Sequence, residues 1–101
     1  MNYISTRDKS VVVSASKAIA QGISVEGGLF VPESFPSFTA DDFKALSELD
    51  YKGRAKYILR NFLTDFTEEE VNYCIDGAYT GTFDNEQPAP ISLVGKNTNL
   101  L

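Results

Sequence analysis

A glycine-rich stretch is the first place where this sequence could do chemistry. GISVEGGLFVP, from Gly22 to Pro32, holds three glycines, and glycine-rich loops cradle phosphates when they lead into a helix N-terminus. Here Gly27 and Gly28 lead instead into Leu29–Val31, an apolar run typical of a strand, and no Lys-Ser or Lys-Thr follows. The order favours a tight turn before a short buried strand that ends at Pro32, over a phosphate cradle.

Acid–base and nucleophilic catalysis have few candidates, because the chain has no histidine. Cys74 falls on the apolar stripe of an expected helix, which favours a core side chain over a thiolate nucleophile. The carboxylate pairs Asp41–Asp42 and Asp84 with Glu86 suit acid–base work, but they are also ordinary acids of a cap and a loop. Lys96 could form a Schiff base, yet it falls in an expected hairpin turn.

Two charged runs could bind ions. Lys52, Lys56 and Arg60 recur every four residues, which makes either an anion-binding ridge or, more commonly, the solvated face of an amphipathic helix. Glu68–Glu70 could hold a hard cation, but neighbouring helical positions point in different directions and helix capping already explains them. We therefore expect neither a metal site nor a catalytic constellation.

Composition indicates a folded protein of 101 residues, long enough for one small domain, 1–101. The formal charge of −5 argues against a nucleic-acid partner, which requires clustered positive charge. The single cysteine fits a reducing compartment. Because no apolar run approaches the roughly twenty residues that cross a bilayer, and the N-terminus lacks a signal-peptide core, we predict a cytoplasmic protein without a membrane partner.

The first part of the chain is expected to combine short strands with one helix. Tyr3–Ile4 and the β-branched run Val11–Val13 favour strands. Ser14 is a candidate N-cap for a helix of about two turns, which Gly22 should end in a left-handed conformation.

Three further helices are predicted from caps and apolar spacing. Thr39 with Asp42 and Thr67 with Glu70 resemble capping boxes, and Asp50 offers a third cap. The expected inner stripes are Phe43, Leu46 and Leu49, then Tyr51, Ala55, Ile58, Leu59, Phe62 and Leu63, and finally Val71, Cys74, Ile75, Ala78 and Tyr79.

The segment from Ile91 to Leu101 is expected to form a hairpin that turns at Gly95–Asn97, after a loop over 82–90. The fold class is therefore predicted as α+β: a small mixed domain in which about four short helices pack on short β-strands, with a C-terminal hairpin. The apolar stripes are expected to meet in one shared core.

Six segments in order resemble the N-terminal domain of threonine synthase. They are STR at Ser5–Arg7, the helix start Ser14–Ala18, GISVEGGLFVP, LDYKGRAKYIL, AYTGTF and PAPISL. The most specific is GISVEGGLFVP, which is similar to the family signature G-L-A-x-D-G-G-L-[FY]-V-P. Two positions depart from the family pattern: Asp8 stands where a glycine is usual, and Glu26 stands where an aspartate is usual.

The resemblance implies a pyridoxal-phosphate enzyme of the second fold type that converts O-phosphohomoserine and water to threonine and phosphate, with the cofactor as electron sink. It implies that the Schiff-base lysine lies in a catalytic domain beyond Leu101, so this chain is an inactive N-terminal fragment whose partner is that domain. No catalytic, cofactor-binding or metal residue is then expected here. Ser5, Thr6 and Arg7 are the candidates for a place near the active site; alternatively, Arg7 anchors the first strand through an ion pair, for which Glu26 is a candidate.

Two other readings stay open. The chain could be a stand-alone acidic module without enzymatic activity that binds another protein through an exposed apolar patch, with Phe35 and Phe38 as candidates. A small enzyme that uses aspartates and Cys74 has the least support, because no base pairs with the thiol.

Overall fold

The N-terminal part of the chain is a three-stranded antiparallel sheet with one short helix. The computed structural model describes residues 1–84 and 86–101. Strands β1 (Tyr3–Ser5), β2 (Val12–Val13) and β3 (Phe30–Pro32) lie in the order β2-β1-β3, so β1 is central. Ile4 pairs with Val12 on one side and with Val31 on the other. Pro32 ends an edge strand, a position that tolerates its missing N–H.

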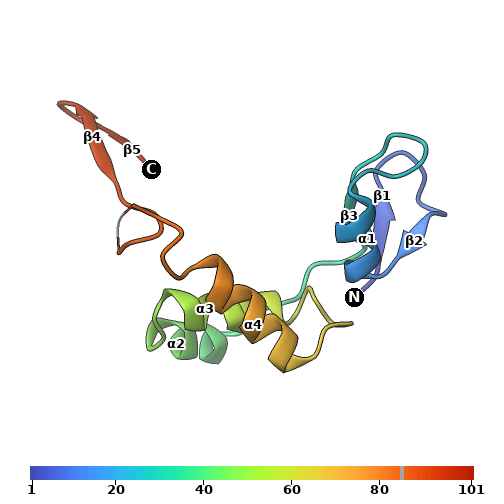
Figure 1. Cartoon of the computed structure of the whole chain (residues 1–101), viewed down its shortest axis with the longest axis horizontal. Helices are drawn as coiled ribbons and strands as arrows, with labels where there is room; N and C mark the ends of the chain where they lie inside the picture. The colour runs from blue at the N-terminus through green and yellow to red at the C-terminus, as the bar shows by residue number, and fades with distance from the viewer. Residues whose placement is uncertain (85) are drawn as a thin grey trace.

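Helix α1 (Ala15–Gln21) lies beside this sheet (Figure 1). As predicted, it begins at Ser14, whose side chain accepts the Lys17 N–H, and ends at Gly22 with φ 76°. The ψ of Gly22, −67°, differs from the value of a left-handed helical residue, which is the conformation that we expected.

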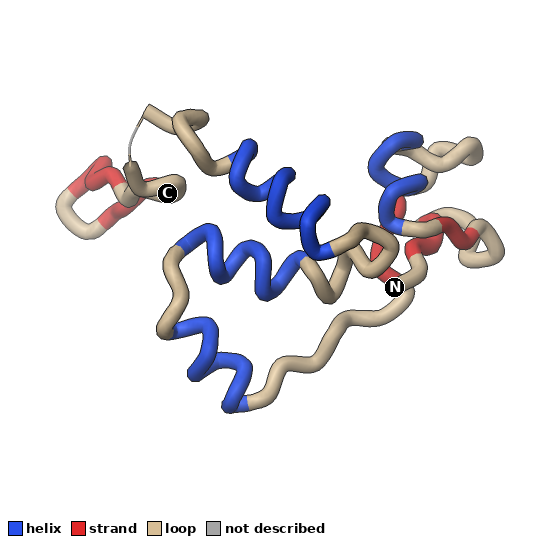
Figure 2. Tube along the Cα trace, turned by 60° about the horizontal axis from the view of Figure 1, so that its bottom comes forward, coloured by secondary structure: helices blue, strands red, loops and turns tan. Residues whose placement is uncertain are grey.

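Three helices form the middle of the molecule: α2 (Ala40–Ser47), α3 (Tyr51–Leu59) and α4 (Glu68–Ala78) (Figure 2). Both predicted capping boxes are present, and Asp50 caps α3 through the Gly53 N–H. Helix α4 packs on α3 and buries Val71 and Ile75, which lie one turn apart on the same face. These predictions are confirmed. A helix cap needs only one side chain and a backbone N–H three residues further on, so it can be predicted from the local sequence.

The last element is the hairpin of β4 (Ser92–Gly95) and β5 (Thr98–Leu100). Leu93 pairs with Asn99 and Ser92 with Leu100, and the register shifts before Gly95 pairs with Thr98. Within residues 1–84 and 86–101, four helices and two small antiparallel sheets confirm the predicted α+β class.

The molecule has an open, V-like outline, with the N-terminal sheet and the hairpin as its two arms and the three helices at its base (Figure 1). Its radius of gyration is 16.8 Å, whereas a compact domain of this length has about 13 Å. Its accessible surface is 7604 Å², against about 5,700 Å² for a compact protein of the same mass. The chain therefore exposes roughly 1,900 Å² more than a self-contained domain of its size.

The apolar side chains do not meet in one core, which corrects our expectation. The buried apolar residues form two groups: Ala15 and Ala18 under the N-terminal sheet, and Val71 and Ile75 between α3 and α4. Contacts to the turn after α3 join the two parts, since the Tyr3 hydroxyl donates to the Phe62 carbonyl over 3.0 Å. Helix α4 covers only one apolar stripe, the one that packs on α3, so the apolar side chains on the other helix faces remain exposed to solvent.

Several predictions of burial are wrong for this reason, and Tyr51, Ile58 and Ala78 of the predicted inner stripes are also exposed. Leu29–Val31 is not a buried strand: Leu29 is 61% exposed and Val31 lies on an edge strand. Phe43 on α2 is 63% exposed. Cys74 is exposed because Val71 and Ile75 take the contact with α3.

The stripe predicted for the third helix also runs past the helix end. Helix α3 stops at Leu59, and Phe62 and Leu63 follow in the next turn. Among the described residues, no helix is long and apolar enough to span a membrane.

Candidate functional site

The loop Ser5–Arg7, called the STR loop below, joins the end of β1 to the turn that leads into β2. Ser5 is fully buried, and its Oγ accepts the N–H of Arg7 over 3.2 Å and that of Asp8 over 3.5 Å. A buried hydroxyl with these partners fixes the direction in which the backbone leaves the strand. Ser5 is thus a positioning residue for the rest of the loop.

Thr6 ties the STR loop to the chain that enters β3. Its N–H donates to the Leu29 carbonyl over 2.9 Å, and its Oγ1 accepts the Leu29 N–H over 3.0 Å. These two hydrogen bonds extend the pairing of β1 with β3 past the strand end. Thr6 itself is exposed.

The glycine pair forms the turn that faces the STR loop. The Gly27 N–H donates to the Ser24 carbonyl, and Gly27 takes a φ of 85°, which favours glycine. A Cβ on Gly28 would lie 2.1 Å from Ser5 Oγ and 3.0 Å from the Arg7 nitrogen. The predicted glycine turn is therefore confirmed, and its glycines allow two backbone segments to pack closely. Ser5 and Arg7 occupy the space at Gly28.

Arg7 makes a different contact from the ion pair that we considered. Its Nη1 donates to the backbone carbonyl of Glu26 over 3.0 Å, while the Glu26 carboxylate accepts the Ser24 hydroxyl over 2.6 Å. Hydrogen bonds from Ser24, and then from Ser5, lower the pKa of Glu26. Arg7 is exposed, and among the described residues its guanidinium makes this one hydrogen bond, so other donors still face solvent.

Asp8 organises the turn that follows the STR loop. Its carboxylate accepts both the N–H and the hydroxyl of Ser10, and these bonds lower the pKa of Asp8. Its carbonyl accepts the Val11 N–H. The aspartate thus closes this turn through its own side chain.

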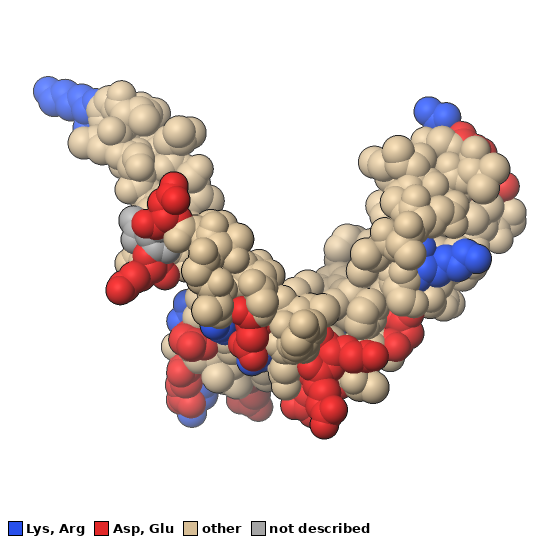
Figure 3. Space-filling view, viewed as in Figure 1, with Lys and Arg blue, Asp and Glu red and all other residues tan. Residues whose placement is uncertain are grey.

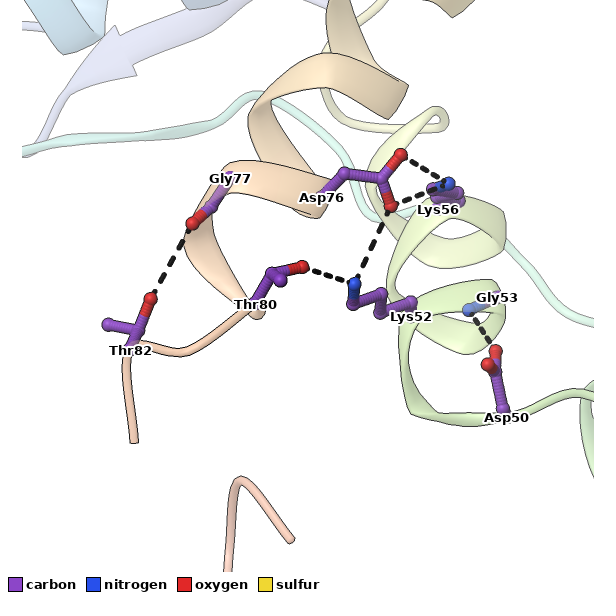
Figure 4. Close-up of polar contacts among 8 residues, drawn as sticks. All are labelled: Asp50, Lys52, Gly53, Lys56, Asp76, Gly77, Thr80 and Thr82. Atoms are coloured by element: carbon purple, nitrogen blue, oxygen red, sulfur yellow. Dashed lines mark hydrogen bonds and ion pairs between the residues drawn. The ribbon is translucent and has the colours of Figure 1, made fainter. Parts of the chain in front are cut away.

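The basic run on α3 is an internal contact surface rather than a free ridge. Figure 4 shows Lys52 and Lys56 converging on Asp76 of α4, with Nζ–Oδ1 distances of 4.0 and 3.0 Å. Lys52 also donates to Thr80, and the Arg60 guanidinium lies 4.1 Å from the centre of the Tyr57 ring. These lysines are a third exposed and hold two helices together.

The remaining sequence candidates are dispersed. Glu70 closes its capping box, and no cluster of three metal-ligating side chains occurs within the part of the chain that the structure describes. Asp41 and Asp42 belong to the first turn of α2, while Asp84, Glu86 and Lys96 are exposed. The structure does not bring these groups to the STR loop or into one catalytic arrangement.

Sequence reasoning missed one hydrogen bond between two helices. The Tyr57 hydroxyl donates to Asp42 over 2.6 Å and links α3 to α2. This bond, with those from Thr39, lowers the pKa of Asp42 to about 2. The cap was readable from spacing, but its second partner lies 15 residues away, and no local signal reports it.

The residues present do not fit a pyridoxal-phosphate site. Schiff-base lysines are activated by desolvation or by a neighbouring cation. Lys9, Lys17, Lys44 and Lys96 are exposed, and Lys52 and Lys56 pair with Asp76. The glycine turn is filled by Ser5 and Arg7. We therefore assign no cofactor contact and no chemical step to this chain.

Comparisons with known proteins agree on one family. The family described as "Threonine synthase N terminus" matches residues 2–79. Threonine synthase from Methylobacillus glycogenes is 34% identical over 79 residues, which cover 78% of this chain and 17% of that protein. Threonine synthase from Escherichia coli is 30% identical over 71 residues, 70% of this chain and 17% of the relative.

Solved structures show the same likeness in three dimensions. A pyridoxal-phosphate-bound threonine synthase from Brucella melitensis superposes with a TM-score of 0.81 and 30% identity, over 99% of this chain and 22% of that one. Threonine synthase from Escherichia coli gives 0.78 and 26%, over 98% and 22%. This chain thus spans about a fifth of the length of these relatives. It belongs to the threonine synthase N-terminal domain family.

Proposed function

We propose that this chain, residues 1–101, works as the N-terminal domain of a cytoplasmic, pyridoxal-phosphate-dependent threonine synthase. The complete enzyme converts O-phosphohomoserine and water to L-threonine and phosphate, a step of threonine biosynthesis, and the cofactor supplies the electron sink. The observation that carries the proposal is the match to residues 2–79, together with the 99% coverage of the chain by a cofactor-bound relative.

The role of the domain in this proposal is to pack on the catalytic domain. Roughly 1,900 Å² of accessible surface beyond that of a compact protein leaves room for a large interface. The isolated chain is inactive in this proposal because it supplies neither the cofactor lysine nor the phosphate loop. A stand-alone interaction module would use the same open surface, with Phe35 exposed on it, but it would not account for the family match.

The reaction is tested with the complete protein that contains this sequence. Supplied with pyridoxal phosphate and O-phosphohomoserine, it should release threonine and phosphate in equal amounts. The chain of 101 residues at the same concentration should release neither. Absence of turnover by the complete, cofactor-loaded protein would contradict the proposal, as would turnover by the chain alone.

The STR loop is proposed to lie near the active site of the complete enzyme. This rests on the free donors of Arg7, which suit a phosphate or carboxylate, and on the rigid hydrogen-bonded base formed by Ser5 and Thr6. Arg7→Ala should then raise the KM for O-phosphohomoserine, and Arg7→Lys should restore it in part.

A matched control separates proximity from folding. Arg54 also donates to backbone carbonyls, those of Leu46 and Ser47, from an exposed position on α3. Arg54→Ala should leave the KM unchanged. Equal effects of the two alanine variants on KM would show that Arg7 only anchors its loop to the Glu26 carbonyl.

A further inference from the structure

The β4–β5 hairpin has no cover of its own. Every residue from 91 to 101 is exposed. Its large apolar side chains are exposed by 60% to 83% of their area, and they are Ile91, Leu93, Val94, Leu100 and Leu101. The segment holds one charge, Lys96 at the turn. In Figure 3 the hairpin arm is mostly uncharged, whereas acidic side chains gather around the helices at the base.

The register places apolar side chains on both faces of the hairpin. Leu93 faces the same side as its partner Asn99, and Leu100 faces the same side as its partner Ser92. Neighbouring residues of a strand point to opposite faces, so the two leucines lie on opposite sides. A strand that is apolar on both faces is typical of a sheet covered on both sides.

The hairpin is also a sheet with two open edges. It forms a sheet of its own, separate from β2-β1-β3. A lone two-stranded hairpin is marginal in water, and unpaired edges accept further strands. It lies outside residues 2–79, the part that matches the family of the N-terminal domain.

The occupant is indicated by the comparison with a complete enzyme. The relative from Brucella melitensis superposes on 99% of this chain, hairpin included, with a TM-score of 0.81. The open outline is therefore the form that this segment takes in a protein where this part is 22% of the whole. The remaining polypeptide of such an enzyme is available to cover the exposed arm.

We infer that the β4–β5 hairpin is a docking element, paired along an edge and covered on both faces by the catalytic part of the same polypeptide. This inference rests on the proposed function. It divides the chain by role: residues 2–79 form the N-terminal domain proper, and the hairpin is a strand pair contributed to the neighbouring sheet. Main-chain pairing would hold the contact, and Leu93 and Leu100 would fill apolar positions on opposite sides.

The test measures thiol accessibility in the complete, cofactor-loaded enzyme. In a Cys74→Ala background, single variants Leu93→Cys and Leu100→Cys probe the two faces, and Lys96→Cys at the turn is the matched exposed control; sites are read by mass spectrometry. Alkylation at 93 and at 100 should be at least about tenfold slower than at 96 in the native enzyme. All three rates should agree in urea.

Native rates at position 93 or position 100 that equal the rate at 96 would overturn the inference. So would protection that disappears on dilution, because a second copy would then be the cover. Should a cysteine variant not fold, hydrogen exchange of the unaltered enzyme decides: segment 91–101 should exchange as slowly as β1, and exchange as fast as that of the loop 80–84 would overturn the inference.

Turnover of the same preparations keeps this test apart from the proposed function. An enzyme that makes threonine with an accessible hairpin would reject the docking element alone. A protein that protects the hairpin but releases no threonine would reject the reaction alone.

Discussion

The close approach at Gly28 gives the sharpest prediction from the structure. Replacing Gly28 with alanine places a Cβ 2.1 Å from Ser5 Oγ, where a contact distance of roughly 3.5 Å or more is normal. Ser5 is fully buried and its Oγ accepts the N–H groups of Arg7 and Asp8, so moving its side chain would break these hydrogen bonds. The backbone nitrogen of Arg7, 3.0 Å from the new atom, closes the other side. The STR loop must therefore shift away from the glycine turn.

The cost follows from what that shift breaks. Overpacking a tight site costs about 1–3 kcal/mol, and each lost hydrogen bond to Ser5 Oγ costs about 0.5–1.5 kcal/mol. Overpacking together with one lost hydrogen bond gives about 1.5–4.5 kcal/mol, which corresponds to roughly 10- to 2,000-fold in an opening equilibrium. The φ of Gly28 is not in the left-handed region, so the effect is steric and does not depend on backbone strain.

Native-state hydrogen exchange reads this effect directly. The N–H groups of Thr6 and Leu29 are hydrogen bonded across the site, and their exchange should accelerate by that factor in Gly28→Ala. Gly77→Ala is the matched control, because its Cβ would meet nothing within 4 Å; in the last turn of α4 it should be neutral or stabilising by up to about 1 kcal/mol. Unchanged exchange of Thr6 and Leu29 in Gly28→Ala would refute the packing argument.

Three further predictions concern caps, titration and cofactor. Thr67→Ala removes the oxygen that accepts the Glu70 N–H and should destabilise α4 by about 1 kcal/mol, seen as a lower urea midpoint; an unchanged midpoint would discount the capping box. In the folded chain the pKa of Asp42 is about 2, below its usual value. The ionised Asp42 carboxylate therefore stabilises the folded state fully above roughly pH 4, and this contribution to folding stability is lost as the pH falls towards 2. Tyr57→Phe should raise that pKa in a carboxyl NMR titration, and an unmoved titration would show that Tyr57 is not its main cause. The chain of 101 residues mixed with pyridoxal phosphate should show no Schiff-base absorbance beyond a surface-lysine control; stoichiometric, borohydride-trappable labelling of one lysine would contradict this.

Sequence patterns predicted the local features that depend only on neighbouring residues, namely the helix caps and the glycine turn. The caps at Ser14, Thr39, Asp50 and Thr67 are all present, because each depends on one side chain and an amide three residues on. The glycine turn is present for a similar reason. Gly27 and Gly28 of this turn lie against the STR loop, where an added Cβ would meet Arg7 and Ser5.

Burial was less predictable, because the spacing of apolar residues indicates an apolar helix face or strand but not which other element packs on it. Phe43, Cys74 and Leu29 lie on apolar patterns and are exposed. This chain spans about a fifth of the length of its relatives. The Arg7 contact was missed for another reason: sequence indicates a charge but not whether a carboxylate or a carbonyl receives it.

Dependence of turnover on this chain tests the central claim most directly. The claim is that these 101 residues act as a domain that completes a threonine synthase. The remainder of the complete protein is produced with and without the 101-residue chain as a separate polypeptide in the same cells, and threonine formation from O-phosphohomoserine is measured. We predict turnover only when both polypeptides are present. A remainder that makes threonine as fast alone as the complete protein does would contradict the account.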